Sequence, residues 1–393
     1  MNYEKYLNPT IMAVPPSGIR KFFDLAQSMP DCISLGVGEP DFVTPYHIRD
    51  AAISCILDGQ TQYTPNRGLL ALRKEIAYYL ASRYQTEYSP EKEILVTVGA
   101  SEGIDISLRV LLKQGDEVLV PEPSYVSYSP AVRFAGGVAV PVKTTAETDF
   151  RVTAEAIEAA CTAKTKALIL PYPNNPTGAI MDKTTLLEIA KLAKKRDLIV
   201  ISDEIYSELT YGETEHTSFA ALPDMWERTL TINGFSKAFA MTGWRVGYIC
   251  GPKPVVDEMV KMHQYSILCA SMQGQVAAIE ALKRGRENGY EDVMIMKQSY
   301  DRRRRVMLDG FLKMGLTCFE PLGAFYVFPS IKSTGLSSDD FCMSLIREKQ
   351  VACVPGTAFG ASGEGHIRCC YATAMDKLTT ALDRMDEFIQ KRV

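Results

Sequence analysis

The sequence predicts an α/β fold: a mostly parallel, seven-stranded sheet covered by helices, accompanied by a smaller α+β domain. The first observation behind this prediction is that short β-rich runs alternate with amphipathic helical stretches through the middle of the chain, as in parallel sheets covered on both faces. The second is size, since 393 residues with 46% hydrophobic content can form one large core and a smaller one. The third is that this alternation stops beyond about Ala270.

Seven apolar runs supply the predicted strands, and helical patterns lie between them. One such helix is predicted over Thr184–Ala193, where the apolar residues recur on a single side. The predicted strands, in chain order, are Ile94–Val98, Glu117–Val120, Val138–Val142, Ala167–Leu170, Leu198–Ile201, Thr229–Ile232 and Val246–Cys250.

The C-terminal part of the chain has a different pattern. Apolar residues recur at helical spacings from Met296 to Met314, which predicts a long helix, and we expect its Arg302–Arg305 run to be solvated or to face another subunit. Short strands are predicted near residues 325–328 and 366–368, followed by a final helix. We therefore predict a large domain at 46–280 and a small domain formed by 1–45 and 281–393.

Composition and motifs argue against several classes of function. The net charge of −4 without a basic stripe argues against nucleic-acid binding, and no run of 18 apolar residues predicts a membrane span. The first residues lack the pattern of a secretion signal, so a cytoplasmic location is expected. Ten cysteines without a CxxC pair and four histidines without ligand spacing predict free thiols in the core and no metal site.

Polar residues recur shortly after the predicted strands. In open α/β sheets ligands bind beyond the carboxyl ends of the strands, so residues at that position are candidates for a functional site. The residues that share the position are Ser101, Tyr125, Asn175, Asp203 and Lys237. We expect them to gather at one edge of the sheet.

Lys237 is the candidate covalent centre. It stands among small and apolar residues in the run Asn233–Arg245, and burial favours the neutral amine, which can form an imine with a carbonyl cofactor. Asp203 follows the apolar run Leu198–Ile201, 34 residues upstream of the lysine. Taken alone, this run is more typical of a solvated surface lysine than of a catalytic one. A lysine, a carboxylate and donors for a phosphate together fit pyridoxal phosphate.

A turn over Gly99–Gly103 is the candidate phosphate site. It leaves the strand that ends at Val98 and enters an apolar helix, so backbone N–H groups near Ala100 and Ser101 are placed to bind an anion. As a motif it is weak, because it is not GxGxxG and small turns before helices are common. Ser236 and Arg245 supply a hydroxyl and a guanidinium for the same anion.

Over nearly its whole length the chain resembles the class I, fold-type I pyridoxal-phosphate aminotransferases, especially the prokaryotic aspartate and aromatic group. The resemblance implies pyridoxal 5'-phosphate joined to Lys237 as a Schiff base, with Asp203 keeping the ring nitrogen protonated. It implies that Tyr206 and Asn175 bind the phenolic oxygen of the ring. Tyr125 is expected to stack on the ring, where many relatives have tryptophan.

The same resemblance implies how substrate and a second subunit take part. Arg368 is expected to hold the substrate carboxylate with two parallel hydrogen bonds, and the backbone N–H of Gly38 to assist it, with Asn175 also at the substrate. Tyr63 is expected to reach the phosphate of the neighbouring subunit. A homodimer with shared active sites is therefore implied.

The predicted reaction is ping-pong amino transfer from an aromatic or aspartate-like amino acid to a 2-oxo acid, with 2-oxoglutarate expected, and Lys237 as the base. Ile19, Phe22 and Phe23 favour aromatic donors. Alternatives remain open: another pyridoxal-phosphate reaction such as β-elimination (a β-lyase) or decarboxylation, transfer from N-acetyl-diaminopimelate, or a non-catalytic regulator. A nicotinamide dehydrogenase is disfavoured because no GxGxxG follows the first strand.

Overall fold

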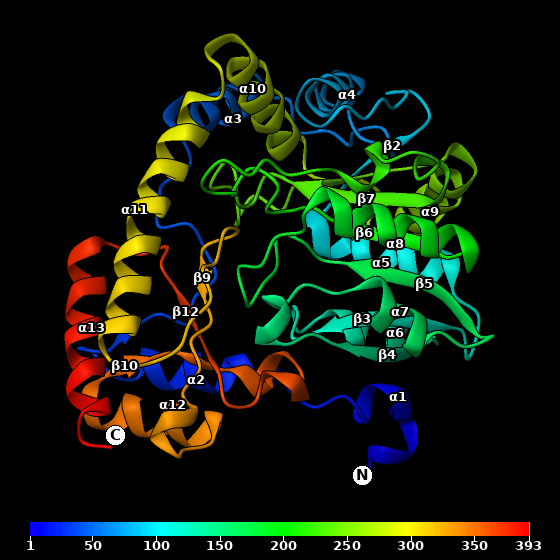
Figure 1. The fold of residues 1–393 in the computed structure, drawn as a ribbon. Helices are drawn as coiled ribbons and strands as arrows, with labels where there is room; N and C mark the ends of the chain where they lie inside the picture. The colour runs from blue at the N-terminus through cyan, green and yellow to red at the C-terminus, as the bar shows by residue number, and fades with distance from the viewer. Residues whose placement is uncertain (393) are drawn as a thin grey trace.

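The computed structural model describes residues 1–392, and within that range a seven-stranded sheet forms the core of the larger part of the molecule, on the right in Figure 1, in the order β2-β8-β7-β6-β5-β3-β4. β8 runs antiparallel to both of its neighbours, and the other neighbouring strands pair in parallel. The predicted fold class is confirmed, and each predicted strand is present with its ends shifted by at most two residues. The strands are β2 (Ile94–Thr97), β3 (Glu117–Glu122), β4 (Val138–Lys143), β5 (Thr165–Leu170), β6 (Ile199–Asp203), β7 (Thr229–Gly234) and β8 (Gly247–Cys250).

Both faces of this sheet are buried, because neighbouring residues of one strand enter different hydrophobic cores. In β5, Ala167 and Ile169 pack in one core, whereas Leu168 and Leu170 pack in another. Helices α5, α6 and α9 cover the first face, and α7 and α8 cover the second. Their bounds are α5 (Gly99–Leu111), α6 (Tyr128–Phe134), α7 (Ala154–Ala160), α8 (Lys183–Lys195) and α9 (Lys253–Ser266).

Helix α8 illustrates how the sequence sets such an element. The carboxylate of Asp182 accepts a hydrogen bond from the backbone N–H of Thr185 at 2.9 Å and so caps the helix. Leu186 and Ile189 are buried on the side that faces the sheet, and lysines occupy the last turn, where the helix dipole favours cations. The predicted helix Thr184–Ala193 is confirmed.

A second region combines the N-terminal segment with the C-terminal part of the chain. Strand β1 pairs in parallel with β10 through Ile33 and Val351, and an antiparallel sheet has the order β11-β12-β9. Its strands are β1 (Ile33–Ser34), β9 (Tyr326–Val327), β10 (Val351–Ala352), β11 (Val354–Pro355) and β12 (Ile367–Cys370). Its helices are α2 (Gly18–Gln27), α11 (Glu291–Lys313), α12 (Ser338–Lys349) and α13 (Met375–Ile389). The domain boundaries at residues 46–280 stay a prediction.

Helix α11 enters this region from the top of Figure 1, and its lower part lies beside α13. It carries the predicted apolar stripe, with Met296 and Tyr300 buried. The surface prediction for its arginine run is wrong for Arg304, whereas Arg303 is only partly exposed. Arg304 is 3% exposed and pairs with Asp301 and Glu320, and Arg303 pairs with Asp41 at 2.7 Å. Part of this run of like charges is buried because acidic residues from other segments pair with it. The local sequence pattern of the helix does not indicate those partners.

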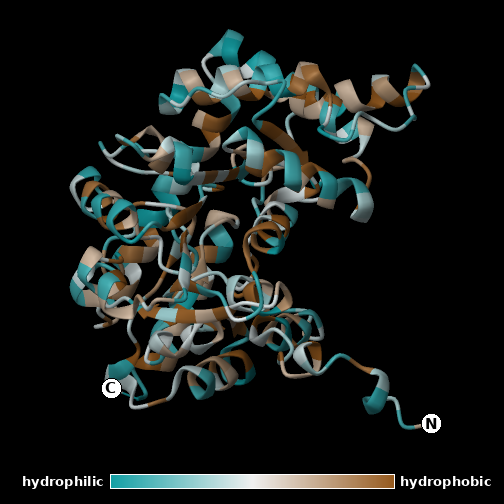
Figure 2. Cartoon of the chain, turned by 90° about the vertical axis from the view of Figure 1, so that its right-hand side faces the viewer, coloured by the Kyte–Doolittle hydropathy of each residue, from teal (hydrophilic) through white to brown (hydrophobic). Residues whose placement is uncertain are grey.

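The remaining helices are α1 (Pro9–Met12), α3 (Tyr46–Leu57), α4 (Leu70–Tyr84) and α10 (Met272–Asn288). α3, α4 and α10 pack together next to the β2 edge of the sheet. The N-terminal segment projects from the body of the molecule (Figure 2), and residues 1–13 are exposed. Among residues 1–392, no helix combines the length and the apolar character that crossing a membrane requires.

Candidate active site

A cavity of about 690 Å³ lies between the carboxyl ends of the large sheet and the second region. The strands β2, β3, β5, β6 and β7 each lead into a segment that lines it, as the topology of open α/β sheets predicts. Every residue predicted to bind the cofactor or the substrate carboxylate lines the cavity except Tyr63. Those residues are Gly38, Ala100, Ser101, Tyr125, Asn175, Asp203, Tyr206, Ser236, Lys237, Arg245 and Arg368.

Lys237 follows the end of β7 by three residues and extends its amine into the cavity. Its Nζ donates a hydrogen bond to the carbonyl oxygen of Gly38 at 2.8 Å and lies 5.8 Å from the ring centre of Tyr206. Burial lowers the pKa of the Lys237 ammonium to about 8, although the nearby thiol of Cys370 and carboxylate of Glu39 act against that shift. A much larger fraction of this amine than of an ordinary lysine is therefore neutral at physiological pH, and the neutral form is the one that acts as a nucleophile or base.

Asp203 is the last residue of β6 and is 5% exposed. Tyr128 donates its hydroxyl to Oδ2 at 2.7 Å, and the backbone N–H of Ile205 donates to Oδ1 at 3.2 Å. Burial raises the pKa of the Asp203 carboxyl to about 6, and both hydrogen bonds oppose that rise because they favour the charged form. The sequence analysis missed Tyr128, although its position three residues after Tyr125 was available as a signal.

We call Ala100, Ser101, Ser236 and Arg245 the anion cradle. Ala100 and Ser101 lie in the first turn of α5, so their free N–H groups and the helix dipole attract negative charge. Gly99 has a φ of +74°, and a Cβ there would lie 2.5 Å from a guanidinium nitrogen of Arg245. Glycine therefore lets the arginine lie directly against the turn, and the cradle gathers a cation, a hydroxyl and backbone donors.

Arg368, on β12, forms the opposite end of the cavity together with Asn175 and the Gly36–Gly38 segment. Its Nη1 donates to Oδ1 of Asn175 at 3.0 Å, and its Nη2 donates to the carbonyl of Gly36 at 2.5 Å. The Nε atom is buried without a hydrogen-bond partner among the described residues. The guanidinium is thus fixed in place and retains capacity to bind a carboxylate.

Two tyrosines join this end of the cavity to the lysine. The hydroxyl of Tyr326 lies 2.9 Å from that of Tyr206, and the Tyr326 ring centre lies 4.7 Å from the guanidinium carbon of Arg368. A Cβ at Gly38 would lie 2.5 Å from the Tyr326 hydroxyl, which explains the glycine there. The sequence analysis placed Tyr326 in a strand but not in the site, because its role depends on residues more than 100 positions away.

Tyr63 does not line the cavity, and its side chain is 80% exposed. Neighbouring apolar residues are exposed as well, including Leu57 at 80% and Tyr265 at 88%. Asn66 ties this segment to the α9–α10 connection by donating to the carbonyl of Leu268 at 2.9 Å. The assignment of Tyr63 to the site of a second subunit stays a prediction.

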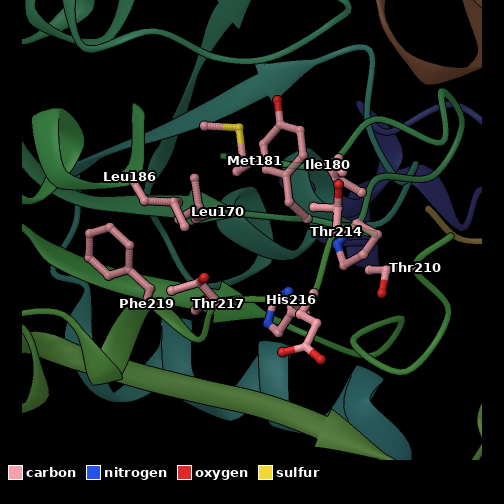
Figure 3. A pocket seen from close by; sticks show the side chains of 13 residues that line it. Leu170, Ile180, Met181, Leu186, Thr210, Thr214, His216, Thr217 and Phe219 are labelled. Carbon is pink, nitrogen blue, oxygen red and sulfur yellow. The ribbon is translucent and has the colours of Figure 1, made fainter. Parts of the chain in front are cut away.

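A second cavity lies among Leu170, Met181, His216 and Phe219 (Figure 3), but its volume of about 10 Å³ suits one water molecule at most. Beside it, Nε2 of His216 lies 3.0 Å from Oε2 of the fully buried Glu204. The cavity is therefore a packed part of the core beside a buried histidine–glutamate contact, and it is too small for a substrate.

Comparison with known proteins agrees with this geometry. A family model described as aminotransferase class I and II matches residues 30–385. The chain is 47% identical to an aspartate aminotransferase of Pyrococcus abyssi (strain GE5 / Orsay), covering 96% of this chain and 97% of the relative. It is 45% identical to aromatic-amino-acid aminotransferase 2 of Thermococcus litoralis, covering 98% and 99%. A solved aspartate aminotransferase from Thermus thermophilus with maleate superimposes with a TM-score of 0.93 at 39% identity, over 97% of this chain and 99% of that one.

Proposed function

The chain belongs to the class I and II aminotransferases, and from that premise we propose that it transfers the α-amino group of an amino acid to a 2-oxo acid, with pyridoxal 5'-phosphate as its cofactor. The observation that carries the proposal is the cavity itself. It has an anion cradle at one side, a carboxylate and a lysine of lowered pKa at its centre, and a fixed arginine at the other side.

The residues of the cavity fit that cofactor. The phosphate would be held by the anion cradle, the ring nitrogen by Asp203, the phenolic oxygen by Tyr206 and Asn175, and the aldehyde carbon by Lys237. Tyr125 lines the same cavity and offers an aromatic face to the ring. When bound, the cofactor supplies an aldehyde that takes up the amino group and a cationic ring that accepts the electron pair of a broken Cα–H bond.

Asp203 would keep a positive charge on the ring nitrogen. A carboxylate next to a cationic ring stabilises it, and Tyr128 holds that carboxylate in one orientation by its hydrogen bond. Burial strengthens the pairing because the effective dielectric constant is low in the interior.

Arg368 would orient the substrate. Its planar guanidinium can bind the α-carboxylate, and its contacts with Asn175 and Gly36 fix the direction from which the carboxylate approaches. A substrate held in this way presents its Cα–H bond toward Lys237.

Lys237 would move the proton. Its Nζ is the basic atom in the centre of the cavity, and a pKa of about 8 leaves a useful fraction of neutral amine at pH 7. Nζ would accept the Cα proton and deliver it to the carbon that carried the cofactor's aldehyde. Water would then release the 2-oxo acid, and the amino group would stay with the cofactor.

The side-chain end of the cavity supports aromatic donors over acidic ones. Ile19 and Phe23 of α2 line it, together with the ring of Tyr326. Phe22, which the sequence analysis grouped with them, is buried in the core of the second region instead and does not line the cavity. Glu39 also lines the cavity, and its carboxylate would repel a second carboxylate of the substrate.

We also propose a homodimer in which Tyr63 reaches the phosphate in the partner's site. The exposed tyrosine and its apolar neighbours Leu57 and Tyr265 form a surface that a second copy can cover. Analytical ultracentrifugation tests the dimer, and Tyr63→Phe is expected to weaken cofactor binding without changing the sedimentation of the dimer.

The proposed reaction is tested with a panel of amino acids and 2-oxoglutarate. We expect glutamate and the donor's 2-oxo acid to form in equal amounts, fastest with aromatic donors, and borohydride to fix the cofactor on the peptide that contains Lys237. The panel also includes aspartate and N-acetyl-diaminopimelate. Ammonia or carbon dioxide released without added 2-oxo acid would indicate a lyase or a decarboxylase instead.

A further inference from the structure

A buried histidine and glutamate lie directly behind the anion cradle. Glu102 stands in the first turn of α5, next to Ser101, and its side chain is 9% exposed. Its Oε1 lies 2.6 Å from Nδ1 of His263 on α9, whose side chain is fully buried. The other ring nitrogen of His263 has no hydrogen-bond partner among residues 1–392, so the ring is held through Nδ1.

Glu102 joins this histidine to the turn that opens the helix. Its second oxygen, Oε2, accepts the backbone N–H of Val98 at 2.5 Å. Gly99 follows with a positive φ and has no side chain to hold the turn. The carboxylate therefore ties the turn to α9, a helix that contributes no residue to the cavity.

The turn at Gly99 and Ala100 carries backbone donors of the anion cradle, and it is tightly packed against its neighbours. A Cβ at Gly247 would lie 2.6 Å from the backbone nitrogen of Ala100, so β8 supports the turn from one side while Arg245 lies against Gly99 on the other. In addition, a free carboxylate in the first turn would repel a bound anion. The hydrogen bonds to His263 and Val98 hold the Glu102 carboxylate and compensate its charge.

We propose that His263 is a positioning residue for the anion cradle and acts through Glu102. It touches neither the reacting atoms nor the cavity, yet it sets the backbone donors at Ala100 and Ser101 that would receive the cofactor's phosphate. This role rests on the proposed function, since it presumes that pyridoxal 5'-phosphate is the ligand.

The test compares two ligands that differ only in the phosphate. Cofactor-free wild type, His263→Leu and His263→Asn are dialysed to equilibrium against pyridoxal 5'-phosphate and, separately, against pyridoxal. We expect His263→Leu to lose about tenfold to 100-fold in affinity for the phosphorylated ligand and to keep its affinity for pyridoxal. His263→Asn should keep most of the affinity for pyridoxal 5'-phosphate, because its side-chain amide can donate a hydrogen bond from nearly the same place as Nδ1.

His47→Leu is the matched control, since His47 also pairs with carboxylates, Asp292 at 2.9 Å and Glu280 at 3.4 Å, away from the cavity. It should leave both affinities unchanged. Equal losses for the two ligands in His263→Leu, or no loss for either, would overturn the positioning role. Wild type that binds neither ligand would instead overturn the proposed function.

Should His263→Leu not fold, Glu102→Asp takes its place. It keeps the charge but shortens the side chain by one methylene, so the carboxylate cannot reach both Val98 and His263. We expect the same selective loss for the phosphorylated ligand, and an unchanged ratio of the two affinities would contradict the proposal.

Discussion

The two ends of the cavity are built in different ways. The anion cradle comes from segments that follow strands of one sheet, and it is closely packed: Gly247 lies against the backbone of Gly99 and Ala100, and Gly99 lies against the Arg245 guanidinium. The substrate end is assembled from the N-terminal segment, Asn175, β9 and β12, and its hydrogen bonds join Arg368 to residues 193 and 332 positions away. The comparison indicates that the first end is set by the sheet and the helices packed against it, whereas the second depends on how two regions of the chain pack.

Lys237 lies between the two ends, so its removal should affect both and give the largest effect. We expect Lys237→Ala to lower kcat by about 10⁴-fold, because the basic nitrogen at the centre of the cavity is lost. The measurement is 2-oxo acid formation, with thermal unfolding as the check on folding. Lys194→Ala, at an exposed ion pair with Asp224, is the control. Turnover close to wild type in Lys237→Ala would remove the lysine from the mechanism.

Arg368→Lys should impair substrate binding and leave the anion cradle unchanged. A lysine cannot offer two parallel donors, so we expect kcat/KM for the amino acid to fall by about 100-fold to 1,000-fold. The affinity for pyridoxal 5'-phosphate should stay within about twofold, since no residue of the anion cradle changes. Steady-state kinetics and equilibrium dialysis measure the two quantities. An equal loss in both would mean that the two ends are not independent.

Gly99→Ala should disturb the anion cradle and leave the substrate end of the cavity unchanged. The added Cβ meets Arg245 and the left-handed backbone disfavours alanine, so cofactor affinity should fall by about tenfold to 100-fold. Gly115→Ala is the matched control, because Gly115 has a similar φ of +85° and no atom within 4 Å of the added Cβ. Gly115→Ala therefore has the same unfavourable left-handed backbone for alanine but makes no contact like the one with Arg245. Similar losses of cofactor affinity in both variants would show that the arginine contact is unimportant.

Tyr128→Phe is expected to give the smallest effect and concerns the pH dependence. The tyrosine hydroxyl lowers the pKa of Asp203, which burial raises to about 6, so its loss should raise that pKa further. Ionised Asp203 is lost as pH falls through its pKa, and cofactor binding should therefore weaken on the acid side, beginning at higher pH in the variant. At pH 7 we expect a loss of about tenfold or less. Superimposable pH profiles of cofactor affinity would contradict the role of Tyr128.

The two ends also differ in how far the sequence predicted them. Asp203 and Lys237 could be predicted because an apolar run indicates a buried strand. The residues that follow such a strand lie at the carboxyl edge of the sheet, where ligands bind. Arg368 has no such local signal, and only the resemblance to a family pointed to it. Tyr128, Tyr326 and the pair of Glu102 with His263 were missed, since each acts on a residue brought close by folding.

By itself the sequence determined the order of strands and helices, the residues that follow the strands and the membership of the family. These depend on local periodicity and on short motifs, which can be recognised in the sequence without knowledge of the fold. Tertiary structure alone decided that Phe22 lies in the core while Phe23 faces the cavity, that Arg304 is buried, and that Tyr128 binds Asp203. The physical reason is that burial and hydrogen-bond partners are properties of pairs of segments, and the pairing is set only when the two regions pack together.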